Sequence, residues 1–230
     1  MWSLSPAETT ALLLSLKVAF WSVAASLPFA VALAWVLSRL SFPGKSLFDA
    51  VVHLPLVLPP VVVGYFLLLA FGRRGAVGAF LEEYLGITFI FRWTGAALAC
   101  AVMGLPLMVR AVRQSLDAVD RGLEAAAATL GAPPLWVFAS VTLPLILPGI
   151  LTGMLLSFAR SLGEFGATIT FVSSIPGETQ TLPLAIYSFT QVPGGDAAAW
   201  RLCLLSIALS LGALVLSEWL ARAARRRVHA

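Results

Sequence analysis

The sequence predicts an all-α integral membrane protein that forms a single domain over residues 1–230. Apolar residues make up 60% of the chain and charged residues only 11%, whereas charged residues alone average about 25% in soluble domains. The mean hydropathy is +0.94, and the apolar residues form long uncharged runs of the kind that cross a bilayer. Lipid, rather than a globular core, is therefore expected to cover most of the apolar surface.

Five runs approach the ~20 apolar residues that a helix needs to cross the hydrocarbon layer. They span residues 18–37, 51–71, 93–109, 135–159 and 202–220. The third is the shortest, and we expect it to continue through Arg110 and Arg113, whose side chains can extend toward the headgroups. Prolines recur inside the runs and predict kinks, while the Gly149-x-x-x-Gly153 spacing favours the close approach of another helix.

The distribution of basic residues predicts how these helices are oriented, because loops rich in Lys and Arg stay on the cytoplasmic side. With five crossings, one face collects Arg39, Lys45, Arg110, Arg113, Arg121, Arg222, Arg225, Arg226 and Arg227. The opposite face holds fewer basic residues, and Glu82 and Glu83 offset some of them. We therefore expect the amino terminus outside and the carboxy terminus in the cytoplasm.

Two segments fit neither a crossing nor a short turn. Residues 117–144 would form a cytoplasmic loop whose alanine-rich first part favours a short helix. In that loop, Gly131 followed by Pro133 and Pro134 predicts an abrupt end to the helix. Residues 160–199 would lie outside, where their apolar stretches predict re-entrant or surface-lying pieces rather than a free loop.

Several function classes find no support in the sequence. Gly44-Lys45-Ser46 ends like a phosphate-binding loop, but the first glycine of that pattern would fall at Arg39. Cys100 and Cys203 stand in apolar stretches without metal-ligand spacing, so we expect neither a disulfide nor a metal site. No catalytic cluster is recognisable, and membrane orientation explains the basic clusters better than a nucleic-acid partner does. We predict no enzymatic activity and no cofactor bound by this chain.

Residues 120–144, DRGLEAAAATLGAPPLWVFASVTLP, carry the most informative pattern. They resemble the permease family of ABC importers, whose hallmark is Glu-Ala-Ala, three residues, Gly, nine residues, Ile, one residue and Leu-Pro. Gly131, Val141 and Leu143-Pro144 match the second half, with Val in place of Ile. The glutamate slot holds Ala125, whereas Glu124 lies one residue earlier, a shift that turns a helical side chain by about 100°.

The resemblance implies that this loop docks on a separate cytoplasmic ATPase, to which a short helix of small residues would be anchored by a glycine turn and apolar side chains. An ordinary alanine-rich loop is the alternative, and the ordered match from Gly131 to Pro144 favours docking. The candidate coupling residues are Glu124, Ala125, Ala126, Leu130, Gly131, Leu135, Val141, Leu143 and Pro144.

Nearly the whole chain, notably residues 38–72 and 159–195, is similar to the molybdate (and tungstate) branch of these permeases. The resemblance implies a homodimer in the bacterial inner membrane, two ATPase subunits that use ATP and Mg, an extracytoplasmic oxyanion-binding protein and alternating access. A sulfate or thiosulfate permease is the nearest alternative. An ion-coupled secondary transporter is disfavoured, because such carriers place ionisable residues at mid-membrane.

The outer end of the fourth run is the candidate gate or translocation path. Conduction requires weak binding, so small and polar groups with little fixed charge would suit an oxyanion. The candidates are Ser157, Arg160, Gly163, Glu164, Phe165, Gly166 and Thr168. Arg160 and Glu164 have the i,i+4 spacing of a helical ion pair, which favours a structural pair over direct contact with the substrate.

Overall fold

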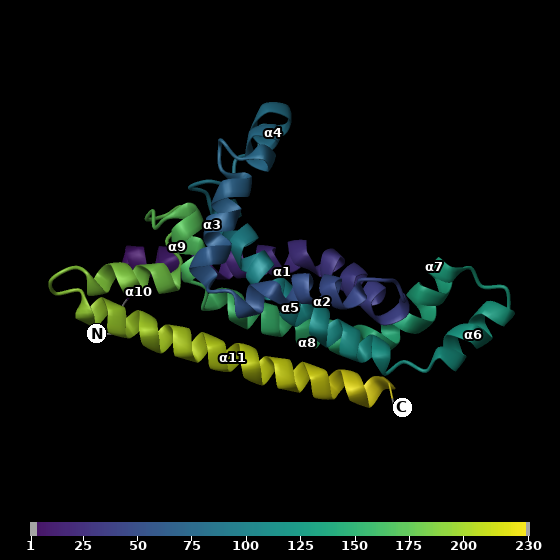
Figure 1. The fold of residues 1–230 in the computed structure, drawn as a ribbon. Coiled ribbons are helices and arrows are strands. Elements are labelled where there is room, and N and C mark those ends of the chain that lie inside the picture. Colours follow the sequence, from purple (N-terminus) through teal and green to yellow (C-terminus); the bar gives the residue numbers. More distant parts are fainter. Residues whose placement is uncertain (1–3, 229–230) are drawn as a thin grey trace.

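Four long helices run side by side and form the body of the protein (Figure 1). The computed structural model describes the backbone of residues 4–228, and the side chains of that range except those of residues 217, 218 and 220–228. The side chains of the four basic residues predicted near the carboxy terminus therefore lie outside the described set. The long helices are α1 (Pro6–Arg39), α5 (Trp93–Asp117), α8 (Leu143–Leu162) and α11 (Asp196–Val228).

The first helix begins twelve residues before the first apolar run. Ser5 caps it, because its hydroxyl accepts from Glu8 N while its own backbone N–H donates to Glu8 Oε2 at 2.6 Å. This capping box satisfies helix-end donors. Glu8 is fully buried, and Arg201 at the start of α11 offsets its charge, with 2.8 Å between Nη2 and Oε1. The pair links the start of the first long helix to the start of the last.

The second predicted crossing is broken in the structure. It forms α2 (Lys45–Val57) and α3 (Pro60–Phe71), whose axes are bent by 111°. Pro59 and Pro60 cause the break, since neither can donate the hydrogen bond that continues a helix. Figure 1 shows α3 leading away from the long helices toward α4 (Ala76–Leu85). The described residues therefore contain four helices long enough to span a membrane, or five spans if the bent pair counts as one.

The third and fourth predicted crossings are longer than their apolar runs. As predicted, α5 continues through Arg110 and Arg113, to Asp117. The fourth crossing begins at α7 (Pro134–Val137), passes through a π-helical turn, η1 (Phe138–Thr142), and continues as α8. Between α5 and α7 lies the short helix α6 (Arg121–Thr129).

Glycines let α5 and α8 pack closely, as the spacing of Gly149 and Gly153 predicts. A methyl group added at Gly153 would lie 3.1 Å from Met108 Cα, and one added at Gly149 would collide with Ser115 Oγ. Further along the same two helices, a methyl group added at Gly104 would likewise collide with Ser157 Oγ. The two backbones therefore meet at mid-helix, where close packing stabilises helices in lipid.

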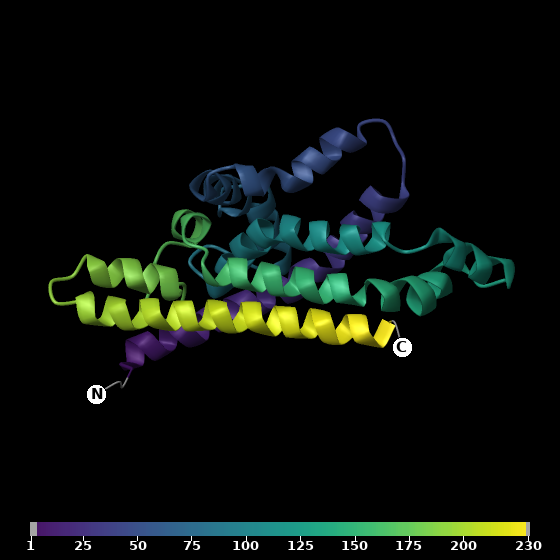
Figure 2. The same ribbon diagram turned by 90° about the horizontal axis from the view of Figure 1, so that it is seen from below.

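The segment predicted outside contains two short helices, α9 (Gly166–Val172) and α10 (Leu182–Thr190). A Cβ at Gly64 would lie 2.6 Å from Ala167 O, so α9 rests directly on α3. The turn before α10 is organised by the buried Thr179, whose hydroxyl accepts from Ile175 N and donates to Ser173 O, both at 2.9 Å. Figures 1 and 2 place α10 near the amino-terminal end of the body, opposite α6 and α7.

Candidate functional site

The short helix α6 stands apart from the body, at the end where α1 and α11 finish (Figures 1 and 2). Asp120 caps its start, because Oδ1 accepts from Gly122 N at 2.8 Å. At its end, Gly131 adopts φ +85°, Gly131 N donates to Ala128 O, and Ala132 N donates to Ala127 O. These two bonds and the left-handed glycine form a Schellman cap. The local sequence thus fixes both ends of a helix that buries none of its own residues.

Large apolar side chains are exposed around this helix. Leu130 is 90% exposed and Leu135 84%. Leu123 is half exposed and Trp136 slightly more than half. Exposed apolar groups of this size, gathered beside a small-residue helix, are typical of a surface that binds another protein. Ala125 and Ala126 are also exposed on α6. Of the first part of the predicted coupling segment, these two alanines, Leu130 and Leu135 are thus accessible to a partner.

The second part of the predicted segment lies closer to the body. Val141 and Leu143 are partly buried, and Leu143 packs against the core formed by α1, α5 and α8. Pro144, in the first turn of α8, is exposed. The Leu-Pro end of the pattern therefore marks where the surface segment joins the membrane helix.

Glu124 lies between these two parts. Its Oε1 is 2.9 Å from Arg39 Nη2, at the last residue of α1, and accepts from Thr142 Oγ1 at 2.7 Å. The side chains of Arg39 and Glu124 are 11% and 23% exposed. A hollow of about 330 Å³ adjoins the three groups, and Trp35, Ala128 and Phe138 are among its other lining residues. The one-residue displacement of Glu124 thus turns its carboxylate toward its own chain.

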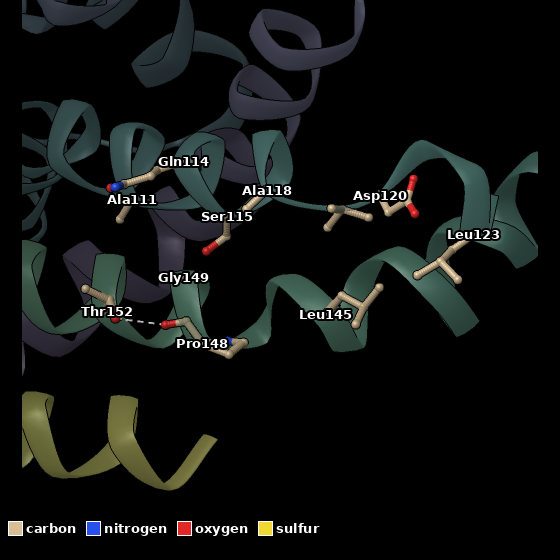
Figure 3. A pocket seen from close by; sticks show the side chains of 11 residues that line it. Ala111, Gln114, Ser115, Ala118, Asp120, Leu123, Leu145, Pro148, Gly149 and Thr152 are labelled. Carbon is tan, nitrogen blue, oxygen red and sulfur yellow. Dashed lines mark hydrogen bonds between the residues drawn. The ribbon is translucent and has the colours of Figure 1, made fainter. Parts of the chain in front are cut away.

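A second hollow, of about 560 Å³, lies between α5 and α8 near α6. Figure 3 shows Gln114 and Ser115 on α5, and Thr152 on α8, around this space. Thr152 Oγ1 donates to Pro148 O at 2.8 Å. The lining contains one charged residue, Asp120, and no basic residue. Gly149 and Ser115, where the two helices approach closely, are part of the lining.

The predicted gate residues are at the other end of α8. Arg160 Nη1 lies 2.6 Å from Glu164 Oε2, so the predicted i,i+4 ion pair is present. The other carboxylate oxygen of Glu164 accepts from Ala167 N at 2.8 Å and so caps α9. Because Glu164 is 1% exposed, this pair holds two helices in place, as a structural pair would.

The remaining gate candidates differ in exposure. Ser157 and Thr168 are buried within the chain, Phe165 and Gly166 are partly buried, and Gly163 is exposed. Gly166 packs against Pro60 of α3, and Phe165 lies 5.3 Å from the Tyr187 ring of α10. None of the predicted gate residues lines either hollow. Their role in the path remains a prediction.

Sequence reasoning missed the partners of the coupling segment. Arg39 was counted only among the basic residues of one face, and Thr142 only as a spacer between Val141 and Leu143. No local pattern links Arg39 to Glu124, which lies 85 positions away in the chain. The same is true of Gln114 and Ser115, which are unremarkable until α8 is placed opposite them.

Comparison with known proteins identifies the family. Residues 26–226 match the model described as "Binding-protein-dependent transport system inner membrane component". The chain is 60% identical over 224 residues to the molybdenum transport system permease protein ModB of Escherichia coli K12, covering 97% of this chain and 98% of the relative. It is 57% identical to ModB of Haemophilus influenzae, over 96% of each chain. A sulfate transport system permease protein, CysW of Synechococcus elongatus, is 41% identical, over 95% of this chain and 77% of the relative.

Solved structures share the fold. A bacterial ABC transporter involved in alginate import matches with a TM-score of 0.71 and 18% identity, over 96% of this chain and 80% of that one. The MetNI methionine ABC transporter matches with a TM-score of 0.69 and 18% identity, over 97% of both chains. With the family model spanning most of the sequence, this chain belongs to the inner membrane components of binding-protein-dependent transport systems: it is a multi-pass transport protein of the inner membrane and not itself an enzyme.

Proposed function

We propose that this chain is the membrane-spanning subunit of an ABC importer that moves molybdate, or tungstate, into the cytoplasm by alternating access. The observation that carries the proposal is the 60% identity to a molybdenum permease across 97% of the chain. Sulfate is the second candidate, because a sulfate permease is 41% identical over 224 residues. Molybdate is favoured by the higher identity and the fuller coverage of both chains.

The proposed partners are a second copy of this chain, two ATPase subunits that bind ATP and Mg, and an extracytoplasmic oxyanion-binding protein. The exposed apolar surface around α6 supports an ATPase dock. A second copy is supported by the hollow between α5 and α8, which the described part of one chain does not enclose. Two-fold homodimers are also the commonest arrangement of identical subunits. The lining of the hollow carries little fixed charge, which suits a path that must bind a dianion weakly enough to release it.

The proposed orientation places the amino terminus outside and α6 in the cytoplasm. It is supported by Arg39, Lys45, Arg113 and Arg121, which lie at the end of the body that carries α6. Single cysteines at Leu130 and Glu178, in a Cys203→Ser background, test it with a membrane-impermeant thiol reagent. In sealed right-side-out vesicles the cysteine at 178 should react and the one at 130 should not. The reverse pattern would invert the topology.

Uptake by the reconstituted complex tests the cargo. Proteoliposomes containing this chain, the ATPase and the binding protein should accumulate labelled molybdate only with ATP inside the cytoplasmic compartment. Excess tungstate should compete and excess sulfate should not. Competition by sulfate at equal concentration would support the sulfate alternative, and uptake driven by an ion gradient without the ATPase would overturn the importer assignment.

A further inference from the structure

We propose that Glu124 is a positioning residue that carries the movement of α6 into the membrane helices through Arg39 and Thr142, rather than a contact for the ATPase. The proposal rests on the proposed function and deepens it. It concerns how the surface helix is attached to the body, which determines how a docked partner could move the rest of the chain.

The attachment of α6 is sparse. The helix buries none of its residues, and Leu123 on it is half exposed. Beneath it lies the hollow of about 330 Å³, so the helix does not rest on a packed apolar surface there. If packing alone carried the movement of α6 into the body, α6 would need close contacts with it, because close-packed side chains transmit displacement between helices. Among the described residues, the hydrogen bonds that join α6 to other helices are those of Glu124.

The link reaches two helices at once. Arg39 ends α1, and its guanidinium lies 2.9 Å from Glu124 Oε1. Thr142, only 2% exposed, ends η1 and directly precedes α8; its hydroxyl donates to the same oxygen at 2.7 Å. One carboxylate oxygen thus joins α6 to the cytoplasmic ends of α1 and α8. A hydrogen bond with an ionised partner is short and directional, so a displacement of α6 pulls on both helices.

The π-helical turn η1 is the point at which the link could rotate α8. In η1, Leu143 N donates to Phe138 O, five residues back, so this turn is wider than the α-helix that follows. Such turns often occur at functional sites. Since α8 packs along α5 and forms one wall of the hollow of about 560 Å³ between them, here called the inner hollow, rotation at η1 would change the width of this space.

The test separates docking from transmission. A cysteine at Ala118, an exposed residue lining the inner hollow, is introduced in a Cys203→Ser background, and its reaction with a thiol reagent is measured in the permease–ATPase complex with ATP and with ADP. The unaltered link should give a nucleotide-dependent rate. Glu124→Ala and Arg39→Ala should each retain the ATPase on co-purification but reduce that nucleotide dependence at least about fivefold, the low end of couplings between distinct sites. Thr142→Val should weaken it less.

A charge swap and a control variant make the result specific. Arg39→Glu combined with Glu124→Arg should recover part of the nucleotide dependence, because the attraction between the two ends is restored. Arg113→Gln, which breaks the 2.9 Å pair with Asp49 at the same end, should leave the response unchanged.

The outcomes are distinct for the two proposals. If the unaltered complex shows no nucleotide dependence although it imports molybdate with ATP, the inner hollow does not respond to the ATPase and the link is refuted; if ATP-driven uptake fails as well, the importer function is wrong. If the unaltered complex shows nucleotide dependence, and Glu124→Ala responds as strongly, or loses ATPase binding while Arg39→Ala keeps it, Glu124 is not a transmitting residue. Failure of the charge swap to exceed both single variants would also refute the link.

Discussion

Gly131 ends α6 in a conformation that only glycine adopts freely. Its φ is +85°, and no atom lies within 4 Å of the place where a Cβ would stand. A side chain at this position would therefore meet no obstacle within the chain, and any loss would come from the backbone. Replacing Gly131 by Ala, Asn, Asp or Val separates these effects, because Asn and Asp tolerate the left-handed region better than Ala, and Val tolerates it least.

The magnitude follows from the cap. Holding an ordinary residue in the left-handed region costs roughly 1–2 kcal/mol, and α6 has no buried residue that would resist local unwinding. The cost thus falls on the helix end rather than on the fold. Because 1–2 kcal/mol corresponds to a factor of about 5 to 30 in an equilibrium, ATPase affinity should fall about fivefold for Gly131→Ala and about thirtyfold for Gly131→Val. Gly131→Asp should stay inserted, bind the ATPase more weakly and lose transport, because its charge would also face the partner.

ATPase affinity measured on purified permease in detergent checks the series. Gly177 is a matched control, since it has φ +80° and equally open space but lies in the turn before α10; Gly177→Val should leave the affinity unchanged. The reasoning is refuted if Asn at 131 weakens binding more than Ala, because size rather than backbone strain would then decide. Unchanged affinity in Gly131→Val would remove this surface from the dock altogether.

Two further predictions concern stability, measured by thermal unfolding in detergent. Gly153→Leu should lower the free energy of unfolding by roughly 2 kcal/mol or more, because a side chain there presses on Met108, whereas Gly212→Leu on α11, where nothing lies within 4 Å, should be neutral. Glu8→Gln should cost about 3 kcal/mol, the low end for breaking a buried pair, since it leaves the partly exposed Arg201 without its charged partner. The double variant Glu8→Leu/Arg201→Leu should lose less stability than either single leucine variant; a larger, additive loss would show that the pair itself stabilises the protein.

Hydropathy predicted the number and approximate position of the crossings, because each apolar run exceeds what a water-exposed helix carries. It could not predict where a run is broken. The run over residues 51–71 is uninterrupted in hydropathy, yet the chain turns by 111° between α2 and α3. Pro59 and Pro60 indicate a weak point, but a proline in a membrane helix also occurs with a mild kink. The bent segment also rests on α9, where Gly64 of α3 contacts Ala167. These two residues are about a hundred positions apart in the chain, so no local pattern predicts the contact.

Some features of the coupling segment were also predictable from local sequence, whereas others were not. Its helix, the glycine stop and the exposed leucines follow from local rules of capping and propensity, and the structure has them at the expected residues. The π-helical turn has no such rule, because its sequence FASVT does not differ from an ordinary helix. Likewise the i,i+4 pair of Arg160 and Glu164 was predictable, whereas the buried role of Glu164 as a cap for α9 depends on where α9 lies.

Among the side chains that the structure describes, three glutamates are paired with arginines where helices meet, and the exposure of each glutamate indicates its role. Glu8 is 0% exposed and Glu164 1% in side-chain terms, whereas Glu124 is 23% exposed. Arg201 and Arg160 are 30% and 28% exposed, so water can solvate them, but a buried glutamate that loses its arginine keeps an uncompensated charge in a medium of low polarity. Glu8 and Glu164 therefore hold fixed joints. Water can reach Glu124 and replace a lost partner at a smaller cost. A joint that must strain and recover during each transport cycle requires that property, and it occurs at the end of the protein where α6 meets the body.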